Sequence, residues 1–225
     1  MATVKVVDLI SRAEIILQDT TNVRWPALEL QSWLNDSYRE ITNLRPDSNT
    51  QTGEYTCVLG ARQVVTTTFA SAIRIIEVVR NTATTSAKGA VRLVNRQMLD
   101  DQRRNWYAET ATVDIQHYMF DPRLPKEFLV YPPATTAARL EVVYSSVPLA
   151  HTLTEAQLTT TPSTETIRID DSYANAMLDY TLYRAYSKDA EYAANAQRAM
   201  AHFQAFQNAL GIKGQVEAAS QPGAA

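Results

Sequence analysis

Residues 24–45 read RWPALELQSWLNDSYREITNLR, and this stretch decides which fold to expect. Its tryptophans, leucines, tyrosine and isoleucine recur three and four residues apart, which is the period of one helix face. Pro26 stands where a first helical turn tolerates proline, and Glu29 lies near the positive end of the helix dipole. The helix is expected to end at Arg45, because Pro46 disfavours the α conformation at the residue before it. Both tryptophans are interpreted as core anchors of a scaffold helix.

Helical periods also occur near both ends of the chain. Residues 4–18 carry one apolar stripe and predict a first helix. Read without a break, residues 171–210 would form a single helix about 60 Å long. The polar residues 187–189 favour a helical hairpin instead, and Gly211 is a plausible stop for its second helix.

Between these regions the apolar period changes to two. Runs of β-branched and aromatic residues, bounded by turn residues, predict six or so short antiparallel strands. The first two runs, 53–59 and 62–68, are split by Gly60-Ala61 and indicate a hairpin. A short helix is expected over 97–106. The remaining expected strands are 72–81, 91–96, 112–121, 127–133 and 139–148.

These patterns predict an α+β fold, in which a bundle of N-terminal and C-terminal helices holds an inserted antiparallel β-rich region. The expected parts are an N-terminal helical pair over 1–50, the β-rich region over 51–165, a C-terminal helical hairpin over 166–211 and an extended tail over 212–225. The expected bundle core is Leu9, Ile10, Ile16, Trp33, Leu34, Ile41, Leu178, Leu182 and Phe203.

Composition and charge exclude several classes of protein. The chain has 225 residues, 45% of them hydrophobic, and a net charge of −3, which argues against a surface built to grip nucleic acid. No stretch approaches about 18 uncharged apolar residues, so neither a membrane span nor a membrane partner is expected. Cys57 is the single cysteine, and no histidine has a second histidine or cysteine at ligand spacing, so no metal site is expected.

No constellation of residues indicates catalysis or a cofactor. The carboxylate pairs Asp100-Asp101 and Asp170-Asp171 are adjacent in sequence, so on a helix their side chains point in different directions and suit capping instead. Neither a glycine-rich phosphate loop nor a GxSxG elbow is present. We therefore expect no enzyme, no catalytic residue and no cofactor.

Two features suggest binding rather than chemistry. Arg96, Arg103 and Arg104 with Trp106 resemble a stacking and phosphate patch, although acidic neighbours favour a solvated short helix. Alanine is dense in the last helix, on more than one face, which suits either a second contact surface or simply a strong helix former. These alanines are Ala193, Ala194, Ala196, Ala199, Ala201, Ala205 and Ala209.

Three stretches resemble a family of tailed-phage head-to-tail adaptor proteins, also called connector or neck proteins. Residues 24–47 are similar to its N-terminal signature, and residues 173–211, with LYRAYSKDAEY most distinctive, to its C-terminal helical pair. VYPP at 130–133, followed by a strand that ends YSSVP, is similar to its middle region. The resemblance covers about residues 4–211.

The resemblance implies a structural virion protein of the neck, assembled in the host cytoplasm. Its partners would be copies of itself in a ring of about twelve subunits, the portal protein, and tail or nozzle proteins. Genomic DNA would pass through the lumen without specific binding. Opposite charges on different faces of a subunit should then meet across each seam. The candidate contact residues are Arg39, Glu40, Arg184, Asp189 and Arg198, with Lys213 and Gln215 in the tail.

Three other functions remain open at this point. The first is a tail-completion or terminator protein, located further down the particle. The second is a nucleic-acid-binding module that uses the arginines around Trp106. The third is an enzyme with an unrecognised carboxylate site.

Overall fold

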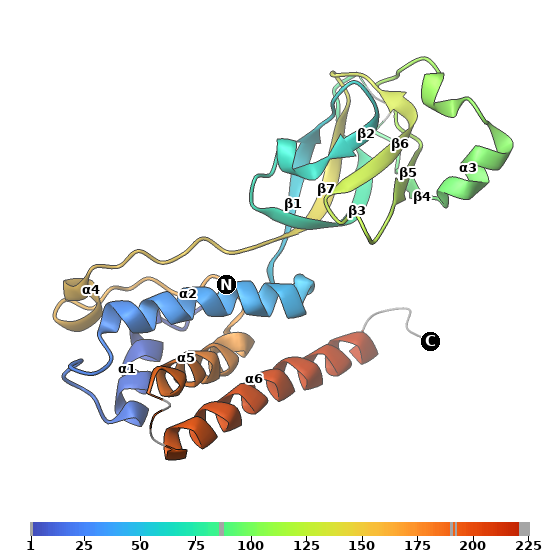
Figure 1. Cartoon of the computed structure of the whole chain (residues 1–225). Coiled ribbons are helices and arrows are strands. Elements are labelled where there is room, and N and C mark those ends of the chain that lie inside the picture. The colour runs from blue at the N-terminus through green and yellow to red at the C-terminus, as the bar shows by residue number, and fades with distance from the viewer. Residues whose placement is uncertain (1, 86–87, 190, 192, 221–225) are drawn as a thin grey trace. The chain divides into compact units, whose positions relative to one another are not determined.

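The computed structural model describes residues 2–85, 88–189, 191 and 193–220, with side chains except at 193 and 212–220. The chain divides into two compact units, and each is described by itself. The helical unit comprises residues 1–48 and 148–225, and the β unit comprises residues 49–147. Helices at both ends of the sequence flank a β region, so the predicted α+β class is confirmed (Figure 1).

The helical unit is built around α5, which contacts α1, α2 and α6. Residues 148–165, assigned above to the β-rich region, belong to this unit. Its helices are α1 (Val6–Leu17), α2 (Ala27–Leu44), α4 (Glu155–Thr159), α5 (Ala174–Lys188) and α6 (Ala193–Ser220), with the short 3-10 turns η1 (Pro46–Asn49) and η4 (Asp171–Tyr173).

α5 and α6 are two antiparallel helices, which confirms the hairpin and excludes one long helix. The ring of Tyr180 lies 5.3 Å from that of Phe206, and the ring of Tyr183 lies 4.8 Å from that of Phe203. His202 Nδ1 and Asp179 Oδ1 are 2.9 Å apart across the same pair of helices. The aromatic side chains therefore close the hairpin along its length.

The end of α6 differs from the prediction. The helix continues through Gly211 to Ser220, where an extended tail was expected. A glycine inside a helix costs only about 1 kcal/mol relative to alanine. The extension contains a second glycine, Gly214, but its other residues include Lys, Gln, Glu and Ala, all strong helix formers, which outweigh the two penalties.

The core of the helical unit follows the predicted stripes with one error. Leu9, Ile10, Trp33, Leu34, Ile41, Leu178 and Leu182 are buried, and Phe203 packs against them partly buried. Ile16 is 43% exposed, because the buried stripe of α1 passes through Leu9, Ala13 and Leu17 and leaves Ile16 at its margin. Trp25 is also a core anchor, and its Nε1–H donates to the carbonyl oxygen of Ala185 at 3.1 Å.

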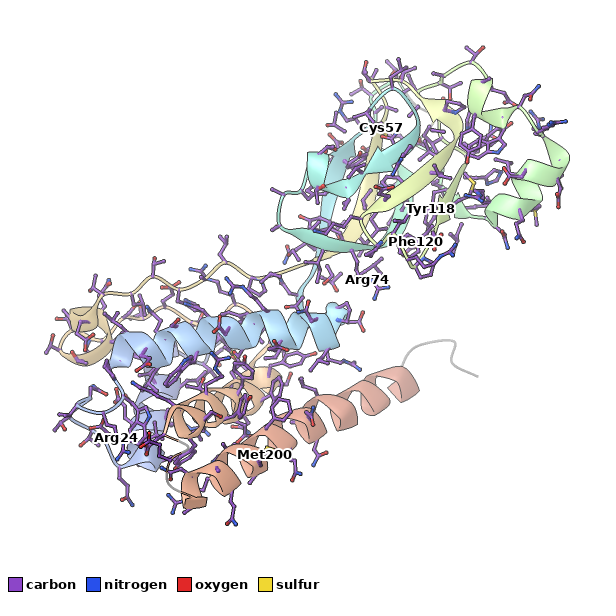
Figure 2. All side chains as sticks on the ribbon, in the orientation of Figure 1. Arg24, Cys57, Arg74, Tyr118, Phe120 and Met200 are labelled. Carbon is purple, nitrogen blue, oxygen red and sulfur yellow. The ribbon has the colours of Figure 1, made fainter. Side chains whose placement is uncertain are left out.

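The β unit consists of two sheets. Their strand orders are β1-β7-β3 and β2-β6-β5-β4, and all pairs are antiparallel except β4 with β5. Cys57 and Tyr118, labelled in Figure 2, are core side chains of this unit. The strands are β1 (Thr50–Thr56), β2 (Gly60–Val64), β3 (Ala72–Asn81), β4 (Arg92–Leu93), β5 (His117–Phe120), β6 (Glu127–Ala134) and β7 (Arg139–Ser146), with α3 (Arg96–Gln102), η2 (Val65–Thr67) and η3 (Trp106–Ala108).

The predicted hairpin of the first two strands is wrong. β1 pairs with β7 and β2 pairs with β6, so the chain changes sheet between them. The side chain of Gln63, which is fully buried, donates to the carbonyl oxygens of Val58 and Gly60 and accepts from the Val58 N–H. Gly60 has φ +109°, a conformation that side-chain-bearing residues avoid. These contacts replace hairpin pairing at the corner.

Candidate partner-binding surfaces

Three of the predicted contact residues gather on one face of α2 and α5. Arg39, Glu40 and Arg184 are all exposed. Arg39 Nη1 lies 3.1 Å from Asp36 Oδ1 on the same helix. The pKa of the Tyr180 hydroxyl is raised, chiefly by burial, and the charges of Arg184, Glu40 and Asp36 also act on it. These charged groups therefore lie near one another, as a shared contact surface requires.

The other four predicted contact residues lie elsewhere. The carboxylate of Asp189 pairs with Arg24 and accepts a hydrogen bond from Asn195 Nδ2 at 2.6 Å, so it already has partners within its own chain. The guanidinium of Arg198 lies 5.7 Å from the ring centroid of Tyr186. Lys213 and Gln215 belong to α6, and their side chains are outside the described residues. The contact role of all seven stays a prediction.

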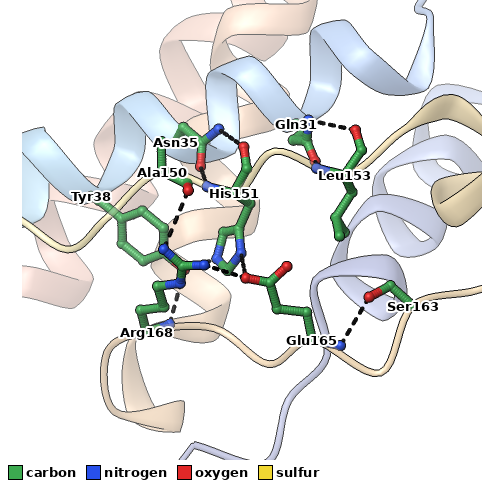
Figure 3. A network of polar contacts seen from close by, with 9 residues as sticks. All are labelled: Gln31, Asn35, Tyr38, Ala150, His151, Leu153, Ser163, Glu165 and Arg168. Atoms are coloured by element: carbon green, nitrogen blue, oxygen red, sulfur yellow. Dashed lines mark hydrogen bonds and ion pairs between the residues drawn. The ribbon is translucent and has the colours of Figure 1, made fainter.

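A buried polar network joins α2 to the segment that returns from the β unit (Figure 3). The hydroxyl of Tyr38 lies 2.7 Å from His151 Nε2, and His151 Nδ1 lies 2.9 Å from Glu165 Oε1. Arg168 binds the same carboxylate, and its backbone N–H donates to the Tyr38 hydroxyl at 3.0 Å. This order of tyrosine, histidine and carboxylate is also found in catalytic relays.

The histidine of this network is shielded from solvent, although Glu165 and Arg168 are 31% and 34% exposed, and the network serves structure. The side chain of His151 is 0% exposed, so no substrate reaches it. Burial lowers the pKa of His151, which keeps the imidazole neutral, with Nδ1–H donating to Glu165 and Nε2 accepting from Tyr38.

Three of the four residues proposed for nucleic-acid binding, Trp106, Arg103 and Arg96, already have partners within the β unit. The Trp106 side chain is fully buried, and its Nε1–H donates to Asp100 Oδ1 at 2.8 Å, so its ring is no stacking platform. Arg103 Nη1 lies 3.2 Å from Glu109 Oε1, and Arg96 Nε lies 3.4 Å from Asp100 Oδ2. The structure thus weakens the nucleic-acid-binding alternative.

The Asp170-Asp171 pair and the cysteine have structural roles, whereas Asp100-Asp101 does not cap α3, whose N-cap is Asn95. Asp170 accepts from the Ser172 N–H and caps η4, as predicted. Asp171 instead accepts from the backbone N–H groups of Thr3 and Val4, and so holds the N-terminal segment. Burial raises the pKa of the Cys57 thiol to about 12, which leaves no reactive thiolate.

In the described part of the chain, the histidines, the cysteine and the carboxylates form no cluster of three that would hold a metal ion. None of the helices in that part of the chain combines the length and the apolar character that crossing a membrane requires.

The β unit also contains an open groove of about 800 Å³ that the sequence reasoning missed. Its walls come from β2, β4, α3, η3, β5, β6 and the β5–β6 turn, so no local sequence pattern predicts the groove. The only local signal is an apolar residue in a polar turn, the leucine of PRLPK. We call this feature the Arg-rimmed groove and define it by Arg62, Leu93, Arg96, Tyr107, Arg123 and Leu124.

The two units differ in charge. The β unit holds eleven Lys and Arg against nine Asp and Glu, a net charge of +2. The helical unit holds ten Lys and Arg against fifteen Asp and Glu, a net charge of −5. One subunit therefore carries surfaces of opposite sign.

Comparison with known proteins agrees with the resemblance described above. No curated protein matches the chain. A family model described as SU10 adaptor protein matches residues 4–225, which is nearly the whole chain. That span includes both helical signatures and the β unit. The chain therefore belongs to the SU10 adaptor protein family, a family of structural bacteriophage proteins.

Proposed function

We propose that the chain is a subunit of a ring in the neck of a phage virion. The ring docks under the portal, extends the DNA channel and presents a surface to the tail. The family match over residues 4–225 is the observation that carries this proposal. The structure supports it, because the polar contacts within each of the two compact units serve to hold the fold and not to build a catalytic site.

Ring formation is supported by the distribution of charge and of exposed residues. A closed ring needs heterologous contacts, in which different faces of one subunit meet. A helical unit of net charge −5 and a β unit of net charge +2 offer such faces. The exposed group of Arg39, Glu40 and Arg184 is a further candidate for the seam or for the portal. The family resemblance implies a ring of about twelve subunits, closed by such heterologous contacts.

Passage of DNA without retention is supported by the same charges. A protein that holds DNA neutralises many phosphates with Lys and Arg. The chain has fewer basic than acidic residues, and Trp106 offers no ring for stacking. We propose that the subunit is made in the host cytoplasm, joins the virion there, and acts by assembly and sealing.

Co-sedimentation with the portal ring tests the proposal. The purified full-length chain is mixed with the portal protein of its own phage, and the portal is pelleted. Saturable recovery of the chain, near one copy per portal subunit, is expected. A portal from an unrelated phage is the control and should pellet none. Failure to bind the portal, together with a virion map that places the chain at the tail end, would favour the tail-completion alternative.

A further inference from the structure

The Arg-rimmed groove has the composition of a protein-binding surface. Leu93, Tyr107 and Leu124 line it with 63%, 50% and 49% of their surface exposed. Met119 and Phe120, the latter labelled in Figure 2, belong to the same lining. Large apolar side chains that gather around one hollow mark an interaction site. Met, Arg and aromatic residues are also enriched at the centres of protein interfaces.

The charges of the rim favour a protein partner that carries carboxylates. Arg62 binds Glu127, and Arg123 binds Asp121, while the two arginine side chains stay 66% and 89% exposed. A guanidinium has five N–H donors, so each retains donors for a second carboxylate. The rim carboxylates would repel the continuous phosphates of a nucleic acid, which makes an apolar and acidic polypeptide the better fit.

The helical unit carries exposed apolar side chains at the end where α1 leads into α2. Ile15 in the last turn of α1, Val23 in the loop and Leu28 in the first turn of α2 are 65%, 81% and 45% exposed. We call residues 15–28 the α1–α2 turn. Leu17, Trp25 and Ala27 of this turn belong to the core of the unit, whereas Ile15, Val23 and Leu28 do not and are available to a neighbour.

Acidic residues accompany this turn. The pKa of Glu14 is raised, chiefly by burial, and the nearby carboxylates of Asp19 and Glu155 raise it further. The carboxylate of Asp19 also accepts hydrogen bonds from the backbone N–H groups of Val23 and Arg24, at 3.1 and 2.7 Å, which places it beside the exposed Val23. The guanidinium of Arg24, the cation of this turn, pairs with Asp189. An apolar surface with acidic neighbours is the chemistry that the Arg-rimmed groove fits.

We propose that the Arg-rimmed groove of one subunit receives the α1–α2 turn of a second copy of the chain. The proposal rests on the proposed ring and names one of its seams. Both surfaces belong to the same chain and differ from each other, so the contact is heterologous and repeats from copy to copy. The net charges of the two units, +2 and −5, favour the same pairing.

Site-directed crosslinking tests this seam in the full-length chain. Val23→Cys and Leu124→Cys place thiols on the two surfaces, and native Cys57 is 2% exposed and should not react. A short bis-maleimide is applied to the chain at high concentration and, separately, with the portal ring present. The double variant should give a ladder of dimers, trimers and larger species. An equal mixture of the two single variants should stop at dimers.

Two matched controls sharpen the result. Leu59→Cys, at a 71% exposed leucine outside the groove, replaces Leu124→Cys and should give no ladder with Val23→Cys. Arg123→Glu, added to the double variant, should remove most of the ladder. Arg80→Glu should not, although Arg80 also pairs with one carboxylate, that of Glu141, on the same unit.

The outcomes separate this inference from the proposed function. A chain that co-sediments with the portal but gives no ladder, or only a link within one chain, overturns the seam and leaves the ring standing. A crosslinked dimer from Val23→Cys alone points to a symmetric contact and also overturns it. A ladder that persists with Leu59→Cys shows that the groove is not the receiving surface. Loss of portal binding with an intact ladder refutes the proposed function and not the seam.

Discussion

Removing one hydroxyl group from the buried network should destabilise the helical unit measurably. Tyr38 is 1% exposed, and its hydroxyl donates to His151 Nε2 at 2.7 Å and accepts from the Arg168 N–H at 3.0 Å. Tyr38→Phe keeps the ring and its packing but leaves both of these groups without their partner. The change therefore isolates the hydrogen bonds from the apolar contacts of the same side chain.

The expected magnitude follows from those two groups. A buried donor or acceptor that loses its partner costs about 1–3 kcal/mol. His151 Nε2 and the Arg168 N–H together predict a loss of about 2–5 kcal/mol in the free energy of unfolding of the helical unit. Small domains have a total stability of about 5–15 kcal/mol, so the loss is a large fraction of it.

Urea unfolding followed by far-ultraviolet circular dichroism measures this loss. Tyr183→Phe is the matched control, because Tyr183 lies in the same unit and packs its ring against Phe203, while in the described part of the chain its hydroxyl has no hydrogen bond. The control should change stability by less than about 0.5 kcal/mol. Equal values for the two variants would refute the view that the Tyr38 hydroxyl holds the network together.

Three further perturbations follow from single contacts. Burial lowers the pKa of His151, so the unfolded chain binds the proton first. Stability of the helical unit should therefore fall as the pH drops below about 6.5, and His151→Gln should flatten that slope in urea titrations at several pH values. Gly53→Ala places a Cβ 2.8 Å from the Phe69 ring and should cost the β unit about 1–3 kcal/mol in thermal unfolding, whereas Gly89→Ala, with nothing within 4 Å, should not. Gln63→Leu leaves backbone groups of the β1–β2 corner unpaired and should cost about 2–4 kcal/mol in the same assay.

The helices were predictable because each buries one continuous stripe. The spacing of apolar residues in 4–18 and 24–45 corresponds to α1 and α2, and the polar residues 187–189 mark the break between α5 and α6. The end of α6 was not predictable from Gly211, because Gly211 and Gly214 compete with the helix formers around them.

Features that depend on distant residues could not be read from local pattern. β1 and β2 resemble a hairpin in sequence, but Gln63 and the strands β6 and β7 decide their true pairing. The Arg-rimmed groove combines Arg62, Leu93 and Arg123 from separate elements, so it exists only once the β unit has folded. Of the predicted contact residues, Arg39, Glu40 and Arg184 lie together because α2 packs on α5.

The polar residues that interrupt the stripe of α2 explain how the chain resumes its helical unit after the β unit. The side chain of Asn35 exchanges two hydrogen bonds with the backbone of His151, at 2.9 and 2.8 Å, and Gln31 does the same for Leu153, at 3.3 and 2.9 Å. Each side-chain amide thus pairs with one backbone N–H and one C=O of an extended segment, as a neighbouring strand would do in a sheet. Because the two residues are four apart, both face the same side of α2. They fix the register of the returning segment where packing alone would let it slide.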